Sequence, residues 1–244
     1  MTTMELGEPI YVGKAKSIYK TDKEDELISL FRNDMTAFNG VKKDSFAGKG
    51  VYNATVSAFF FDYLEKNGVK THFIKMLDDH TMLVKKLDMI PLEVIARNVA
   101  AGSIVKKLPF KEGQILNPPV IVTDYKDDER GDPSVNDDLI IALGLVNRDE
   151  LAEIKATTLK INKLLYDFFD ELGLIFVDFK IEFGKCGNEI LLGDEISMDS
   201  MRLWDKVTKE SFDKDVYRFD KGDVMTAYAK VVEKIMNWQK ENVK

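Results

Sequence analysis

The stretch from Leu174 to Trp204 constrains the fold of this chain more than any other segment. From Val177 to Phe183 apolar and polar residues alternate without interruption, which is the period of a β-strand with one packed face. The packed face is predicted to carry Val177, Phe179, Ile181 and Phe183. The opposite face carries Asp178, Lys180 and Glu182. The sequence therefore predicts a strand with an unusual row of charges on one side.

The residues after this strand predict a hairpin. Gly187-Asn188 suits a two-residue turn because both residues tolerate positive φ, and residues 189–192 form the return strand. This register sets Glu182 opposite Gly193 and leaves Asp194 one residue out of phase, which a bulge at Gly193 would correct. Two carboxylates beside a lysine suit a divalent cation that bridges phosphate oxygens. The alternative is a solvated hairpin face with ordinary surface charge.

The rest of the chain indicates an α+β protein. Its 244 residues can bury a sizeable core, as one large domain or as two lobes. Residues 1–86 are rich in strands with one helix at 50–67, and helices predominate in residues 87–244. We therefore expect a small strand-rich lobe followed by a larger mixed lobe. The clearest helix, at 149–172, has an apolar stripe, ends at Gly173 and leads directly into the alternating strand.

The composition limits the classes of function and of catalytic groups that are open to this chain. The net charge of −7 argues against a nucleic-acid-binding surface, and no run of about 18 apolar residues predicts a membrane span. Residues 1–7 lack the layout of a signal peptide, so we expect a cytoplasmic protein. A single cysteine, Cys186, excludes an intrachain disulfide, and two histidines argue against a multi-histidine metal site or a Ser-His-Asp triad. Lysine, arginine, carboxylates and a metal ion remain, and these are the groups of phosphate-handling enzymes.

Two basic segments are candidate anion sites. Residues 13–17 read Gly-Lys-Ala-Lys-Ser. The glycine allows the backbone to approach a ligand closely, and the two lysines supply positive charge for phosphate oxygens. They match no Walker motif, and a hairpin with solvated lysines is the alternative. Arg97 ends the apolar strand that begins at Pro91 and precedes a helix start near Gly102-Ser103, which favours an anion receptor. A buried ion pair between Arg97 and Glu93 is the competing interpretation.

Three other segments carry weaker expectations. Residues 32–40 are predicted to be a polar loop in which Asp34 and Thr36 could be functional. Residues 106–138 contain several prolines and an acidic run, and are predicted to be an irregular lid or binding loop. Arg218 is a further anion contact in a mixed-charge loop. The last helix, capped by Asp223, has an apolar stripe that could form a homodimer interface or belong to the internal core.

Three stretches taken together resemble one family. They are residues 13–19 (GKAKSIY), residues 91–103 (PLEVIARNVAAGS), and the pair 177–184 (VDFKIEFG) with 193–204 (GDEISMDSMRLW). Their order and spacing are similar to those of the SAICAR synthetase family of purine biosynthesis, along nearly the whole chain. The second and third motifs are the most specific.

This resemblance implies an activity and a fold. Members join L-aspartate to the carboxylate of carboxyaminoimidazole ribotide (CAIR) and cleave ATP to ADP and phosphate. The fold is expected to be α+β, two-lobed and ATP-grasp-like. Because a carboxylate does not acylate an amine unaided, an acyl phosphate intermediate is implied, and its formation calls mainly for charge neutralisation.

The resemblance also implies roles for individual residues. ATP is expected to contact Gly13, Lys14, Ala15, Lys16, Ser17, Lys85 and Leu87. Glu182 and Asp194 are expected to bind Mg²⁺ and to act in catalysis with Lys180, which steadies the transferred phosphoryl group. CAIR is expected to contact Arg97, Ser103 and Arg202, with Asp178 and Arg218 as lesser candidates. Asp34 and Thr36 are expected to border the aspartate pocket.

Two rival functions use the same residues. A kinase would transfer phosphate from Mg·ATP to a small-molecule hydroxyl, without needing aspartate or releasing free phosphate. A regulatory nucleotide-binding module would bind ATP without forming ADP when CAIR and aspartate are present.

Overall fold

A computed structural model of the chain describes residues 6–38 and 40–242. Residues 1–5, which belong to the segment expected to lack a signal peptide, lie outside the described residues, as do Asn39 and residues 243–244. Within the described ranges, no helix has both the length and the apolar character that crossing a membrane requires.

The first sheet has five antiparallel strands in the order β1-β2-β3-β7-β6. They are β1 (Tyr11–Val12), β2 (Lys16–Lys20), β3 (Glu26–Phe31), β7 (Thr81–Lys85) and β6 (Phe73–Met76). A separate hairpin pairs β4 (Asp34–Ala37) with β5 (Lys42–Ser45). The polar loop predicted at residues 32–40 is therefore wrong. Alternation in β4 buries Met35 and Ala37 and leaves Asp34 and Thr36 partly exposed.

The second sheet is built around β10 (Leu174–Cys186), with the order β11-β10-β8-β9 and β12 also paired to β10. Its other strands are β8 (Asp88–Val99), β9 (Ile115–Tyr125), β11 (Glu189–Gly193) and β12 (Met201–Asp205). The irregular segment predicted at 106–138 is wrong where β9 runs. Pro118 and Pro119 fit there because β9 lies at the edge of the sheet, where a missing backbone N–H leaves fewer ladder bonds unmade.

The hairpin of β10 and β11 has the predicted register. Cys186 pairs with Glu189 across the two-residue turn, and Glu182 lies opposite Gly193. The bulge predicted at Gly193 is wrong, because β11 simply ends there and Asp194 turns away with a left-handed backbone (φ 59°). The predicted alternation of β10 also slips at its start. An irregularity between Phe176 and Asp178 puts Phe176 beside Phe179 in the main core.

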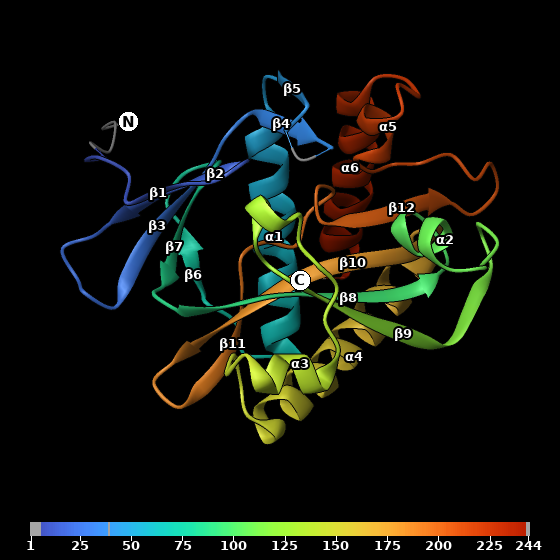
Figure 1. Cartoon of the computed structure of the whole chain (residues 1–244). Helices are drawn as coiled ribbons and strands as arrows, with labels where there is room; N and C mark the ends of the chain where they lie inside the picture. Colours follow the sequence, from blue (N-terminus) through green and yellow to red (C-terminus); the bar gives the residue numbers. More distant parts are fainter. Residues whose placement is uncertain (1–5, 39, 243–244) are drawn as a thin grey trace.

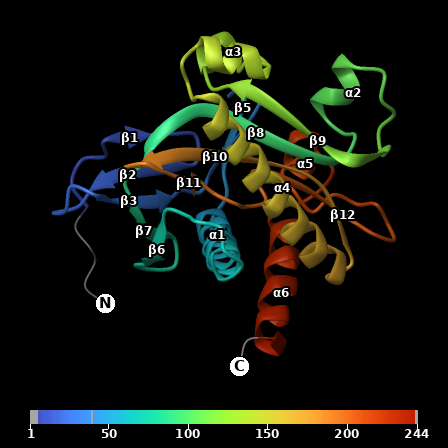
Figure 2. The same ribbon diagram turned by 90° about the horizontal axis from the view of Figure 1, so that it is seen from below.

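Helices cover the strands and complete the core. They are α1 (Lys49–Lys66), α2 (Ser103–Lys107), a 3₁₀ turn η1 (Asp128–Arg130), α3 (Asp137–Ala142), α4 (Arg148–Glu171), α5 (Asp215–Arg218) and α6 (Val224–Asn242). The views in Figures 1 and 2 place α1 between the first sheet and α6, while α4 runs along β10. The stripe of α6, including Tyr228 and Ile235, is buried in the core, which settles the alternative between core and dimer interface for this stripe.

The architecture is α+β and two-lobed, as the sequence predicts. The first sheet ends with β7 at Lys85, and the second begins with β8 at Asp88. The boundary between residues 86 and 87 stays a prediction. Contacts of α1 with strands of the first sheet and with α6 join the two halves of the chain.

Candidate functional site

The charged face of β10 lies against a cleft instead of bulk solvent. Asp178 and Glu182 are each only 3% exposed, so the solvated hairpin considered above is wrong. A cavity of about 300 Å³ opens over this region. Of the residues predicted from the sequence, its lining includes Lys14, Thr36, Arg97, Asp178, Lys180, Arg202 and Arg218. The structure thus brings together side chains from six different segments.

A larger cavity, of about 1530 Å³, lies elsewhere, between α2, β9, α4 and β12. Its lining is largely apolar and contains none of the predicted site residues. We place the candidate site at the smaller cavity because charged groups converge there.

At one end of the smaller cavity, two arginines share one carboxylate. β10 is central, so Asp178 lies opposite Arg97 on β8 and opposite Arg202 on β12. Asp178 Oδ2 accepts hydrogen bonds from Arg97 Nη1 at 2.6 Å and from Arg202 Nη1 at 2.8 Å. The ion pair of Arg97 with Glu93 is therefore wrong, and Glu93 pairs with Lys180 instead, at 2.5 Å.

These arginines differ in their surroundings. Burial lowers the pKa of Arg97, and the neighbouring Arg202 adds to this although Asp178 opposes it. Burial also acts to lower the pKa of Arg202, but Asp178 and Asp215 overcome it and raise that pKa. Arg218 also pairs with Asp215, so three arginines share the carboxylates of Asp178 and Asp215, and this cluster carries surplus positive charge beside the cavity, as an anion site requires.

The segment after β8 fits closely around the arginines. Arg97 Nη2 donates to Ser103 Oγ at 3.2 Å, so Ser103 lies beside the cluster as predicted. Gly102 has a left-handed backbone (φ 66°), and a Cβ placed there would lie 2.5 Å from Arg202 Nη2. The glycine therefore allows backbone and guanidinium to approach.

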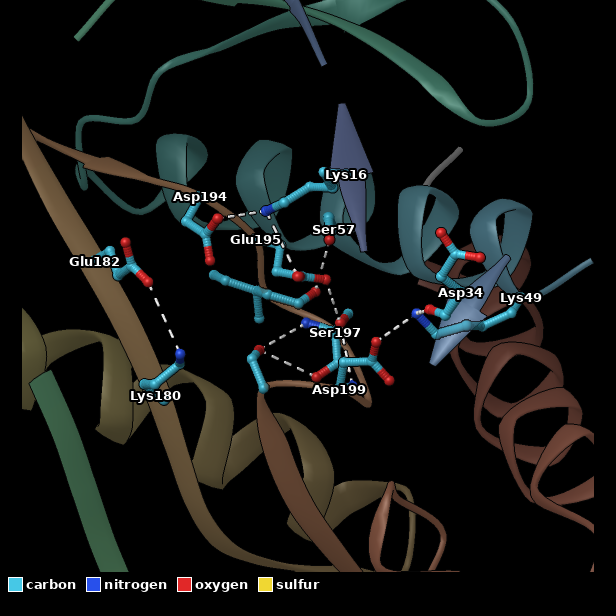
Figure 3. A network of polar contacts seen from close by, with 12 residues as sticks. Lys16, Asp34, Lys49, Ser57, Lys180, Glu182, Asp194, Glu195, Ser197 and Asp199 are labelled. Atoms are coloured by element: carbon cyan, nitrogen blue, oxygen red, sulfur yellow. Dashed lines mark hydrogen bonds and ion pairs between the residues drawn. The ribbon is translucent and has the colours of Figure 1, made fainter. Parts of the chain in front are cut away.

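At the other end of the charged face, carboxylates alternate with lysines. Lys126 Nζ donates to both oxygens of Glu182, at 2.6 and 2.5 Å. Lys16 pairs with Asp194 and lies 3.5 Å from Glu195. Lys180 Nζ is 3.8 Å from Glu182. Figure 3 shows Lys16 directed between Asp194 and Glu195, and Lys180 directed at Glu182.

Electrostatics couples the two predicted metal ligands. Burial raises the pKa of Glu182, and the negative charge of Asp194 raises it further, although Lys126 and Lys180 oppose this. Burial also acts to raise the pKa of Asp194, but Lys16, Lys126 and Lys180 overcome it and hold that pKa well below its usual range. A buried carboxylate beside a half-buried one offers the oxygen ligands that a hard divalent cation prefers.

The basic segment near the N-terminus forms a compact turn. Gly13 N–H donates to Lys16 O at 2.9 Å. The side chain of Arg32 binds both ends of this turn, because it donates to Gly13 O at 2.7 Å and to Ser17 Oγ at 3.0 Å. Lys14 pairs with Asp128 of η1 at 2.6 Å. This turn, including Ala15, connects to the carboxylate cluster through Lys16.

The predicted nucleotide residues of β7 and its following loop also reach the hairpin. Lys85 Nζ donates to Thr71 O at 3.4 Å. Leu87 packs so closely on the hairpin that a Cβ at Gly184 would lie 2.7 Å from the Cβ of Leu87. Lys85 and Leu87 therefore lie near the carboxylate end and apart from the arginine cluster.

Sequence reasoning missed several charged residues of this region. Lys126 was part of a predicted irregular segment, and its pairing with Glu182 follows only from β9 lying beside β8. Lys49 is completely buried in α1, where its Nζ pairs with Asp199 at 2.5 Å and donates to Asp34 O at 2.8 Å. The predicted helix begins at residue 50, so no pattern marked Lys49 as buried. Lys214, in the cavity lining, was not marked by any pattern either.

Asp34 and Thr36 meet different surroundings on β4. Thr36 lines the cavity. The carboxylate of Asp34 pairs with Arg32 at 2.8 Å, and its backbone carbonyl holds Lys49. Figure 3 shows Asp34 and Lys49 beside Asp199.

Comparison with known proteins is consistent across sequence and structure. The family model described as SAICAR synthetase matches residues 9–235. The phosphoribosylaminoimidazole-succinocarboxamide synthase of Methanoregula boonei is 63% identical, over 97% of this chain and 93% of that protein. The synthase of the same name from Methanoculleus marisnigri is 58% identical, over 96% and 97%. A solved SAICAR synthetase in complex with ADP superimposes with a TM-score of 0.91 at 49% identity, covering 93% of this chain and 97% of that one. The SAICAR synthetase of Pyrococcus horikoshii gives a TM-score of 0.88 at 48% identity, covering 91% and 98%.

Proposed function

The chain belongs to the SAICAR synthetase family, and on this premise we propose that it is an ATP-dependent ligase of purine biosynthesis. It joins the amine of L-aspartate to the carboxylate of CAIR and releases SAICAR, ADP and phosphate. The observation that carries the proposal is the pair of arginines that share Asp178, at one end of a face whose other end holds paired carboxylates and lysines. The arginine end of this face suits an anionic substrate, and the end with carboxylates and lysines suits a phosphoryl group.

The reaction proceeds in two steps. The γ-phosphoryl group of ATP moves to a carboxylate oxygen of CAIR, which gives ADP and an acyl phosphate. The amine of L-aspartate then attacks the acyl carbon, a C–N bond forms, the bond to phosphate breaks, and the amine loses a proton. Both steps spread negative charge over phosphoryl oxygens, so positive charge held in place by the protein stabilises them.

The nucleotide is assigned to the carboxylate end. Residues 13–17 supply Gly13 and the two lysines for the phosphates, and Lys85 and Leu87 flank the base. Glu182 and Asp194 would hold Mg²⁺, which neutralises phosphate charge when bound. Support comes from the burial of Glu182, from the partly buried Asp194 beside it, and from the lysines that neutralise both. Lys180, between Glu93 and Glu182, is placed to contact the transferred phosphoryl group.

CAIR is assigned to the arginine end. Arg97, Ser103 and Arg202 would bind its phosphate and carboxylate, and Arg218 lies at the edge of the same cavity. Asp178 points into the arginine cluster, so its role is to position both guanidiniums.

The kinase alternative is not favoured, because the relatives in this comparison are synthases. A cytoplasmic location remains the expectation from the sequence. A homodimer, if formed, would have to use a surface other than the buried stripe of α6.

Omission of each substrate tests the proposal. ADP and free phosphate are expected only when ATP, CAIR and L-aspartate are all present, with SAICAR formed in equal amount. ADP formed without release of free phosphate would indicate a kinase. Tight ATP binding without turnover would indicate a regulatory module.

A further inference from the structure

The cavity over β10 contains one cation that differs from the others. Its lining includes six lysine and arginine side chains: Lys14, Arg97, Lys180, Arg202, Lys214 and Arg218. Five of them form an ion pair with an aspartate or glutamate. For Lys214 Nζ, no carboxylate lies within ion-pair distance among residues 6–38 and 40–242, and no hydrogen bond from it is formed there.

The neighbours of Lys214 explain why it is unpaired. The carboxylate of Asp199 is occupied by Lys49 Nζ at 2.5 Å and by Tyr228 Oη–H at 2.6 Å. The carboxylate of Glu195 accepts from Ser197 Oγ at 2.6 Å and lies 3.5 Å from Lys16.

The charged groups around Lys214 act in both directions. Burial is the largest effect and lowers the pKa of Lys214, and the positive charges of Arg218 and Lys49 lower it further. Asp199, whose effect on Lys214 is the strongest of these charges, and Glu195 oppose this. Lys214 is half-buried, and a cation held partly out of water without a direct ion-pair partner gains from an incoming carboxylate.

We propose that Lys214 binds a carboxylate of the amino-acid substrate, L-aspartate. This assignment rests on the proposed function. A dicarboxylate needs cations of its own in this cavity, because the arginines beside Asp178 are assigned to the ribotide. Lys214 lies in the same lining as Thr36 and Arg218, and its ammonium forms no direct ion pair within the part of the chain that the structure describes. It therefore determines specificity for an acidic amino acid.

Steady-state kinetics of Lys214→Met tests the assignment. A hydrogen bond between charged groups contributes about 1.5–3 kcal/mol, so the KM for L-aspartate should rise by roughly 10- to 100-fold, with the KM for CAIR and ATP nearly unchanged. Lys221→Met, at an exposed lysine outside this cavity, is the matched control and should behave as wild type. An unchanged KM for L-aspartate, or a rise in the KM for CAIR in its place, overturns the assignment.

The pH dependence of Lys214→Arg provides a second test that a purely structural role would not affect. In wild type the KM for L-aspartate should rise with increasing pH, beginning below the usual lysine pKa of about 10.4, because burial lowers the pKa of Lys214. Arginine stays protonated, so the variant should bind L-aspartate with a weaker pH dependence, leaving only the titration of the substrate amine. Identical pH profiles for the two proteins contradict the proposal. Wild type without any aspartate-dependent turnover would instead refute the proposed function itself.

Discussion

Replacement of Asp178 by asparagine tests the arginine cluster directly. The carboxylate of Asp178 is the counterion of Arg97 and one of two counterions of Arg202. Asparagine keeps the size of the side chain and one acceptor oxygen but removes the charge. Two guanidiniums would then face each other across a neutral amide, so the free energy of unfolding should fall by about 3–5 kcal/mol.

The loss of stability from Arg97 should lie in the upper part of this range, and the loss from Arg202 should be smaller. The side chains of Arg97 and Asp178 are each 4% exposed, so solvent screens their interaction little. Arg202 is 17% exposed and keeps Asp215 as a partner at 2.8 Å. Most of the lost unfolding free energy therefore comes from leaving Arg97 buried without a counterion.

Urea unfolding followed by circular dichroism measures the effect. Asp167→Asn is the control, because Asp167 pairs with Lys163 on the exposed face of α4, where such a pair contributes only about 0.3–0.5 kcal/mol. Inorganic phosphate should stabilise Asp178→Asn more than wild type, since an anion can replace the missing charge. A loss no larger than that of the control would refute the view that Asp178 holds the two arginines.

Three further changes test other parts of the site. Glu182→Gln or Asp194→Asn should nearly abolish turnover while the unfolding transition remains cooperative; wild-type rates would remove these residues from the metal site. Arg97→Ala should chiefly raise the KM for CAIR, and a rise confined to the KM for ATP would contradict the ribotide assignment. Burial lowers the pKa of His72 to about 3, so the folded state binds fewer protons than the unfolded state below about pH 6.5. Between about pH 6 and pH 4, the free energy of unfolding of His72→Phe should therefore fall by about 2 kcal/mol less than that of wild type, as measured by urea titrations at each pH. Equal losses would show that His72 is not held neutral.

Local sequence patterns predicted the elements that local physics determines. The turn at Gly187-Asn188 sets the register of its hairpin, so the position of Glu182 opposite Gly193 followed from the sequence and is confirmed. The apolar stripe of α4 is also confirmed, including Thr158, whose hydroxyl donates to Ile154 O at 2.8 Å within the buried face.

Contacts between distant segments were beyond local patterns. Strand β9 was not predicted because it contains Pro118 and Pro119. Proline is tolerated in an edge strand, but the position of a strand in the sheet cannot be read from its own sequence. Without β9, nothing indicated that Lys126 would reach Glu182, 56 positions along the chain. The same holds for Lys49 and Asp199, which are joined only when α1 packs beside the loop that follows β11.

The order of charges along β10 explains why one strand can serve both halves of the proposed reaction. Asp178, Lys180 and Glu182 project from one segment of this central strand, with Asp178 among the arginines and Glu182 among the lysines and Asp194. At about 3.4 Å per residue, the first and last of them are about 14 Å apart. A ribotide phosphate held by the arginines and a nucleotide phosphate held near Glu182 would then be separated by roughly that span, with Lys180 between them. Because β8 pairs with β10 at every residue from Asp178 to Glu182, this spacing is held in place. In the proposed reaction this strand would therefore fix where the two substrates meet, with Lys180 at that point.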